Sequence, residues 1–188
     1  MRAFLVILIV RSLPVKRKVL AAALAIGAAS AAAVRAVDVG WRRMESSVTG
    51  DALWIWSTDD VKSPAPARFT AVRSIALDSD APAARVKIFV DRAYRLLLDG
   101  RLVGAGSKKA GDPLDLWDLP EGLRRGTHVF AIDAQSPTGI GGILFALDVP
   151  GLGRGAVVSD ATWTIAGRPA FVWGAPPMYP WGFPAIPR

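Results

Sequence analysis

Residues 85–104 read RVKIFVDRAYRLLLDGRLVG, and this stretch decides the fold class. Apolar and basic side chains alternate over residues 85–90, which is the period-two pattern of a half-buried β-strand. Residues 94–98 form a second apolar run, followed by Asp99-Gly100, a pair that a two-residue type I′ turn favours. The stretch therefore predicts that residues 101–103 fold back on the second strand as an antiparallel hairpin.

The chain after residue 52 repeats this pattern of short strands and turns. Pro, Gly, Asp and Ser residues that favour turns separate the apolar runs at short intervals. No segment there sustains helical periodicity over three turns, so we predict an all-β fold, an antiparallel β-sandwich or jelly roll. The predicted strands are residues 53–56, 68–75, 85–90, 94–98, 101–103, 114–119, 128–133, 142–148, 157–159 and 162–165.

The strongly basic character of the sequence belongs to its N-terminus. Six of the 23 Lys and Arg residues lie in residues 1–36, which contain none of the 16 Asp and Glu residues, so 17 basic residues face 16 acidic ones in the remainder. A nucleic-acid-binding domain needs a basic face that neutralises phosphates. The near-neutral body therefore argues against that class.

The first 36 residues have the order of an export signal. Lys16-Arg17-Lys18 precedes an uncharged, alanine-rich run, residues 19–34, and small residues suited to a signal peptidase follow. This run is shorter than the roughly 20 residues that span a bilayer. We expect residues 1–36 to be a signal peptide, with a membrane-anchor helix as the alternative, and the protein to be exported to the periplasm or cell envelope.

Three further regions follow from composition. We expect residues 37–51 to be a polar linker, residues 52–172 to be the β-sandwich domain and residues 173–188 to be a tail rich in proline and aromatic residues.

The reactive residue types give no support for a catalytic centre. The sequence contains no cysteine, which excludes disulfides, thiolate metal sites and a lipid anchor attached to cysteine. His128 is the single histidine and lies in an apolar strand pattern. With no second histidine and no cysteine, the sequence gives almost no support for a metal site or for a nucleophile–histidine pair. Most carboxylates occupy loops or turns, where Asp is favoured for backbone reasons. We therefore predict that the protein is not an enzyme.

Several short motifs follow one another in a fixed order over residues 52–182. They are Trp54-Ile55-Trp56, Asp91, Tyr94-Arg95-Leu96, Asp99-Gly100, Leu114-Asp115-Leu116, Gly141-Gly142-Ile143-Leu144, Asp160-Ala161-Thr162-Trp163 and Pro180-Trp181-Gly182. In this order they resemble the non-catalytic β-sandwich domain near the N-terminus of bacterial α-L-rhamnosidases. The resemblance implies a galactose-binding-domain-like fold and carbohydrate binding. The helical catalytic barrel of those enzymes has no counterpart in this sequence, so glycosidase activity is not expected.

The resemblance also implies where a ligand would bind. In sugar-binding members an acidic residue, followed by an acid or amide, precedes the aromatic residue of the second strand, and this pair can hold a calcium ion that the sugar touches. Here Asp91 keeps the first position but Arg92 takes the second, and a cation there opposes a second cation. We expect no cofactor, with calcium as the alternative, and Arg92 is suited to donate hydrogen bonds to sugar hydroxyls.

The expected ligand-binding residues are Asp91, Arg92, Tyr94 and Trp117. Trp117 lies between two Asp residues, Asp115 and Asp118, and an aromatic ring with nearby carboxylates is suited to stack on a sugar. Packing in the core is the alternative role for this tryptophan.

The tail leaves a second function open. Residues 174–188 hold five of the 14 prolines together with Tyr179, Trp181 and Phe183, and such a segment forms neither a helix nor a central strand. It either packs on its own domain or docks a protein partner. The sequence thus predicts an exported, non-catalytic carbohydrate-binding-like β-sandwich with a glycan or polysaccharide partner. The alternative is a protein-docking scaffold or assembly subunit that uses the sandwich and this tail.

Overall fold

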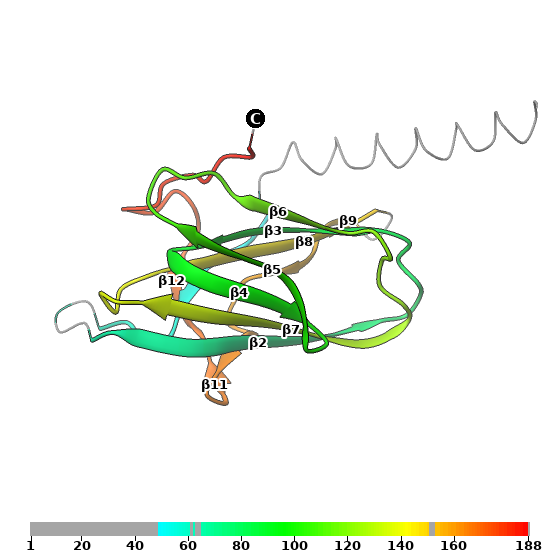
Figure 1. The fold of residues 1–188 in the computed structure, drawn as a ribbon, viewed down its shortest axis with the longest axis horizontal. Helices are drawn as coiled ribbons and strands as arrows, with labels where there is room; N and C mark the ends of the chain where they lie inside the picture. The colour runs from blue at the N-terminus through cyan, green and yellow to red at the C-terminus, as the bar shows by residue number, and fades with distance from the viewer. Residues whose placement is uncertain (1–48, 61, 63–64, 151–152, 188) are drawn as a thin grey trace, which may run out of the picture. The chain divides into compact units, whose positions relative to one another are not determined.

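The computed structural model describes residues 49–60, 62, 65–150 and 153–187, and these residues form two antiparallel sheets (Figure 1). Sheet A has the order β12-β1-β8-β3-β6, with β9 also paired to β8, and sheet B has the order β11-β10-β2-β7-β4-β5. The strands are β1 (Trp54–Trp56), β2 (Ala67–Leu77), β3 (Ala84–Val90), β4 (Arg92–Leu98), β5 (Arg101–Lys108), β6 (Asp115–Leu119), β7 (Gly126–Ser136), β8 (Ile143–Val149), β9 (Gly153–Val158), β10 (Thr164–Ile165), β11 (Arg168–Pro169) and β12 (Phe171–Gly174).

This architecture confirms the predicted all-β antiparallel sandwich. The predicted signal peptide or anchor lies outside the described residues. Among the residues that are described, no helix has the length and apolar character needed to cross a membrane.

The hairpin predicted at Asp99-Gly100 is confirmed. Both residues have positive φ, 50° and 77°, which is the backbone that a type I′ turn requires and that glycine adopts at least cost. Leu98 then pairs with Arg101 across the turn, and the returning strand runs on to Lys108, five residues further than the sequence pattern indicated.

The main apolar core lies between the two sheets. Phe145 of β8 is at its centre, with ring centroids 5.4 Å from Phe130 of β7 and 5.0 Å from Trp163. Trp56 is also fully buried, and its indole N–H donates to the Gly139 carbonyl at 2.9 Å. Large aromatic side chains remove much apolar surface from water, so these rings supply a large part of the stabilisation of a domain that has no disulfide.

A second apolar cluster lies on the outer face of sheet A. Successive residues of a strand point to opposite faces, so Phe89 and Leu144 point outward while Ile88 and Phe145 point into the sandwich. The cluster consists of Ala52, Trp54, Phe89, Leu114, Leu144 and Trp181. Strand β8 is consequently buried along both faces, which explains its nearly continuous apolar sequence.

The position of Lys87 on this outer face differs from what the sequence pattern indicated. The alternation over residues 85–90 indicated that Lys87 lies on a solvated face, but its side chain is fully buried. Its Nζ lies 2.6 Å from Oδ2 of Asp148, a neighbour on β8 that is itself buried. A buried ammonium group requires such a partner, because desolvation without one is very costly.

The hairpin turn is tied to β7 by a small polar cluster. The Asp99 carboxylate accepts the Val129 N–H at 2.8 Å and lies 2.8 Å from Nδ1 of His128. Nε2 of His128 lies 2.7 Å from the Arg124 carbonyl. Both ring nitrogens face acceptors, so the doubly protonated imidazolium is favoured. The hydrogen bond with Asp99, followed by the one with the Arg124 carbonyl, raises the pKa of His128 above its ordinary 6.5 against the opposing effect of burial.

We predict that this cluster makes stability depend on pH. Because the folded-state pKa of His128 is raised, its contribution is fully present below pH 6.5 and is lost as the pH rises through the folded-state pKa. The free energy of unfolding, measured with urea, should therefore fall as the pH rises above 6.5. His128→Gln should flatten this slope, since the sequence has no other histidine. An equal slope in the variant would contradict the assignment.

Candidate functional site

The first candidate site is the junction between β3 and β4, where the chain crosses from sheet A to sheet B. Asp91 occupies the junction, and its backbone N–H donates to the Gly142 carbonyl at 2.9 Å. Its carboxylate is buried and accepts the indole N–H of Trp181 through Oδ2 at 3.0 Å. Oδ1 lies 3.7 Å from Nε of Arg92. Asp91 is therefore both a structural anchor and the only carboxylate in direct contact with Arg92 among the residues described.

Arg92 has an unusual backbone conformation. Its φ of 74° lies in the left-handed region, which costs free energy for a residue with a side chain. The junction holds this conformation from both sides, because Asp91 is bonded to Gly142 and β4 begins at Arg92 itself. Its side chain remains nearly half exposed, so the guanidinium is available to a ligand.

The tail packs against the same end of the domain. The Trp181 ring lies 4.7 Å from that of Trp54 and belongs to the second apolar cluster. Met178 and Gly182 exchange two backbone hydrogen bonds around it, at 3.4 and 2.6 Å. Further along, the Ala185 carbonyl accepts the Leu114 N–H at 2.8 Å. Residues 178–185 are thus part of the folded domain.

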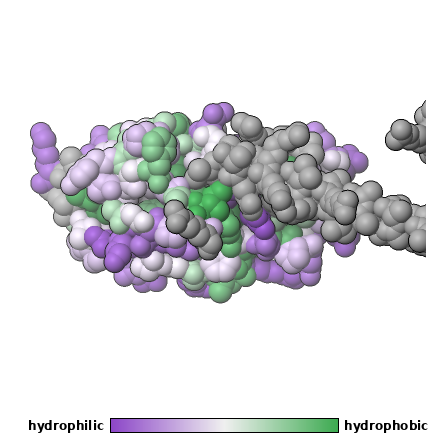
Figure 2. Space-filling model, turned by 90° about the horizontal axis from the view of Figure 1, so that it is seen from above, coloured by the Kyte–Doolittle hydropathy of each residue, from purple (hydrophilic) through white to green (hydrophobic). Residues whose placement is uncertain are grey.

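The three aromatic residues of the tail differ in their exposure to solvent. Trp181 is only 5% exposed, whereas Tyr179 is 95% and Phe183 is 69% exposed. Viewed from above the orientation of Figure 1, apolar surface lies in patches between hydrophilic side chains (Figure 2). Tyr179 and Phe183 are therefore the tail aromatics that can meet a ligand or partner, and Trp181 is not.

Tyr94 and Trp117 belong to a different group of contacts. The Tyr94 hydroxyl donates to Oδ2 of Asp115 at 2.6 Å and accepts the Trp117 indole N–H at 3.1 Å. Asp115 also forms an ion pair with Lys108. Burial, together with the hydrogen bond to Asp115, raises the pKa of Tyr94 far above its ordinary value, so the phenol stays protonated. This network joins β4 and β5 of sheet B to β6 of sheet A.

Two glycines of β5 make room for this network. A Cβ on Gly104 would come within 2.3 Å of the Trp117 ring, and one on Gly106 within 2.6 Å of Oδ2 of Asp115. The Trp117 ring therefore lies directly on the β5 backbone. It closes the edge of the sandwich where β5 and β6 meet, which corresponds to the core-packing role that the sequence left open.

The four expected ligand-binding residues are therefore found in two places. Asp91 and Arg92 are adjacent at the β3–β4 junction, while Tyr94 and Trp117 lie in the β5–β6 edge network. Trp117 pairs in register with Val86, five residues before Asp91 on β3. The sequence pattern did not show which of the tail aromatics would be exposed, because a proline-rich segment carries no periodicity; Tyr179 and Phe183 are exposed and Trp181 is buried. The role of all these residues in ligand binding stays a prediction.

The residues at the β3–β4 junction fit a calcium ion poorly. Calcium needs six to eight oxygen ligands, several of them carboxylates. Here one Asp91 oxygen already accepts the Trp181 indole, and the other lies beside the Arg92 guanidinium. No group of three or more His, Cys, Asp or Glu residues suited to a metal occurs within the described part of the chain.

The fold is similar to that of a fungal lectin. The Pleurotus ostreatus lectin matches in its apo form with a TM-score of 0.59 and 28% identity, and in complex with GalNAc with 0.60 and 27%. Both matches cover 72% of this chain, and they cover 45% and 46% of the lectin chain. This chain therefore spans less than half of the lectin.

Two rhamnosidases share the fold at lower identity. The α-L-rhamnosidase of Streptomyces avermitilis, complexed with L-rhamnose, matches with a TM-score of 0.62 and 22% identity over 72% of this chain and 16% of the enzyme. The GH78 family rhamnosidase of Bacillus sp. GL1 matches with a TM-score of 0.62 and 20% identity, over 74% of this chain and 20% of the enzyme. No protein-family profile and no curated protein matches the chain by sequence. The resemblance to the sandwich domain of rhamnosidases is thus confirmed as a likeness of fold.

We predict that Trp181 is essential to this end of the domain. Trp181→Phe keeps an aromatic ring but removes the donor to the buried Asp91 carboxylate, which should lower the free energy of unfolding by about 1–3 kcal/mol. Tyr179→Phe is the matched control and should change it by less than about 0.5 kcal/mol, since Tyr179 is exposed. Urea unfolding measures both, and equal stability of the two variants would show that the bond is dispensable.

Proposed function

We propose that this protein is an exported, non-catalytic carbohydrate-binding β-sandwich that works in the periplasm or cell envelope. The observation that carries the proposal is the likeness to the Pleurotus ostreatus lectin, one of whose structures contains GalNAc. The likeness covers 72% of the chain and includes the two-sheet sandwich described above.

Two observations support a binding role over a catalytic one. The rhamnosidase matches cover only 16% and 20% of those enzymes, so most of each enzyme has no counterpart in this chain. In addition, the carboxylates near the candidate residues are engaged in the fold: Asp91 with Trp181, and Asp115 with Tyr94 and Lys108. Glycoside hydrolysis requires two carboxyl groups that are available to the scissile bond.

The proposed binding site is the β3–β4 junction with the tail beside it. Arg92 offers several donors in a fixed plane, which suits hydroxyl groups of a neutral sugar. Tyr179 and Phe183 flank the buried Trp181 and offer exposed aromatic faces, which suit the apolar face of a sugar ring. The strained backbone of Arg92 supports this location, because such strain is concentrated at functional positions.

We predict weak, calcium-independent binding of neutral sugars at this site. Calorimetry with GalNAc and rhamnose should give a Kd between about 10 µM and 1 mM, as expected for one aromatic contact and a few solvent-exposed hydrogen bonds. A chelator should leave the Kd unchanged, because the junction fits calcium poorly. Arg92→Ala should weaken binding by about tenfold, since it removes charged donors.

The control for this experiment is Arg101→Ala at the opposite end of the β4–β5 hairpin, which should bind as the wild type does. Absence of binding to any neutral sugar at millimolar concentration would reject the proposed function. Binding that is lost equally in both variants would reject the proposed site.

Export is proposed from the sequence of residues 1–36. We predict that a fusion of residues 1–40 to a reporter that is active only outside the cytoplasm gives a signal, because a basic segment followed by an apolar run directs export. Replacing Lys16, Arg17 and Lys18 by Glu should reduce the signal. A fusion that accumulates without reporter activity would contradict export, and N-terminal sequencing of the secreted body would distinguish cleavage from a retained anchor.

A protein-docking role is the second candidate function. The observation in its favour is that Tyr179 and Phe183 remain exposed although the tail between them is firmly packed. Exposed aromatic residues on a rigid support are typical of protein contact sites. Failure of all sugars in the calorimetric experiment would favour this function.

A further inference from the structure

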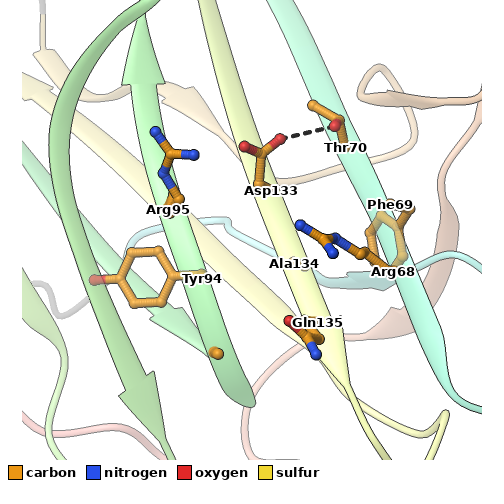
Figure 3. A pocket seen from close by; sticks show the side chains of 9 residues that line it. Arg68, Phe69, Thr70, Tyr94, Arg95, Asp133, Ala134 and Gln135 are labelled. Atoms are coloured by element: carbon orange, nitrogen blue, oxygen red, sulfur yellow. Dashed lines mark hydrogen bonds between the residues drawn. The ribbon is translucent and has the colours of Figure 1, made fainter.

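The outer face of sheet B carries a group of polar side chains that the proposed site does not use. They come from the three central strands β2, β7 and β4, at the end of the sheet where β7 approaches Ser136 (Figure 3). Register places them in two rows across the sheet. Thr70, Asp133 and Arg95 form one row, and Arg68, Gln135 and Ala93 form the next.

These rows enclose a shallow depression of about 480 Å³. Ala93 is the smallest side chain in the two rows, so space is left open above it, beside Gln135. In Figure 3 the Arg68 side chain extends from β2 over β7, between Asp133 and Gln135, and Arg95 lies on the other side of Asp133. A volume of this size accommodates a small ligand such as one or two sugar residues.

Both guanidinium groups of the depression lack a partner within the described part of the chain: the side chains of Arg68 and Arg95 form no ion pair or hydrogen bond there, although their backbones pair in the sheet. Arg85 and Arg73 differ in this respect: Arg85 is bonded to Asp118 at 2.6 and 3.2 Å, and Arg73 donates to the Thr162 carbonyl at 3.3 Å.

The single carboxylate of the depression does not neutralise the two cations. Oδ1 of Asp133 accepts the Thr70 hydroxyl at 2.8 Å, and no ion pair joins Asp133 to either arginine in the described residues. Two guanidinium groups and one carboxylate leave a net charge of +1, so the depression favours an anion. Guanidinium groups bind carboxylates in a bidentate geometry. The second oxygen of Asp133 and the amide of Gln135 are suited to accept and donate hydrogen bonds to hydroxyls.

Aromatic stacking contributes little here. Phe69 and Tyr94 line the depression from below, but their rings point into the sandwich, where Phe69 lies 4.8 Å from Trp56 and Tyr94 is bonded to Asp115. Neutral sugars bind proteins largely through an apolar ring face, whereas this surface offers charge and hydrogen bonds. A ligand that has both a carboxylate and hydroxyl groups fits it best.

We propose that this depression is a second binding site, separate from the β3–β4 junction, for a uronic acid residue of an acidic polysaccharide. Arg68 and Arg95 bind the carboxylate, and Gln135 and Asp133 bind the hydroxyls. The site does not depend on whether the junction binds neutral sugars, since Arg92 and the tail take no part in it.

The test uses the full chain with trigalacturonic acid and its fully methyl-esterified form, which has the same hydroxyls without the charge. Calorimetry should show binding of the acid that weakens about tenfold or more with the ester, and that weakens as ionic strength rises. Arg68→Gln and Arg95→Gln should each weaken binding of the acid by about tenfold, and the double variant should abolish it. Arg101→Gln, the same change on the same sheet outside the depression, should have no effect.

Two further measurements keep the outcome decisive. Arg68→Lys and Arg95→Lys retain charge but lose the bidentate geometry, so each should fall between the wild type and the Gln variant. Amide chemical shifts of the wild type titrated with trigalacturonic acid should change at residues 68–70 and 133–135. Equal binding of acid and ester, or an unaffected double variant, would overturn the site. Loss of acid binding in Arg92→Ala alone would place it at the junction instead, whereas neutral-sugar binding tests the proposed function separately.

Discussion

The hydrogen bond from the Trp181 indole to the Asp91 carboxylate holds one end of this domain together. A buried carboxylate is costly unless donors surround it, and Trp181 supplies one at 3.0 Å. The bond joins residues that are 90 positions apart in the sequence. It holds the tail on sheet A and also holds the β3–β4 junction, where the chain passes from sheet A to sheet B. The orientation of Arg92, which follows Asp91 directly, depends on the same bond.

Features with local causes could be predicted from the sequence. The Asp99-Gly100 turn follows from the need for positive φ, and the strands on either side follow from alternation. Trp54, Trp56 and Trp163 lie in predicted strands, and all three are fully buried, as their large apolar area favours.

Features that depend on contacts between distant segments could not be predicted. Lys87 looks like a solvent-facing residue until the outer face of sheet A is known to be covered. The separation of Trp117 from Asp91 depends on the register of β3 with β6, since side-chain placement across a sheet follows from pairing and not from sequence distance. The grouping of Arg68 with Arg95 likewise requires that β7 lie between β2 and β4.

The candidate surfaces rest on different parts of the fold. The β3–β4 junction depends on the tail and on Gly142, whereas the outer face of sheet B depends on the pairing of three long strands. The edge network of Tyr94, Asp115 and Trp117 lies between them and fastens the two sheets together.

Burial of β8 on both faces has a consequence for handling the protein. Leu144 and Phe89 on the outer face of sheet A are covered together with Trp54 and Trp181, so a chain shortened before residue 181 would present this apolar surface to water. Exposed apolar patches of this kind promote self-association. The residues around Trp181 thus cover an apolar surface of sheet A, and a version shortened before residue 181 is expected to self-associate.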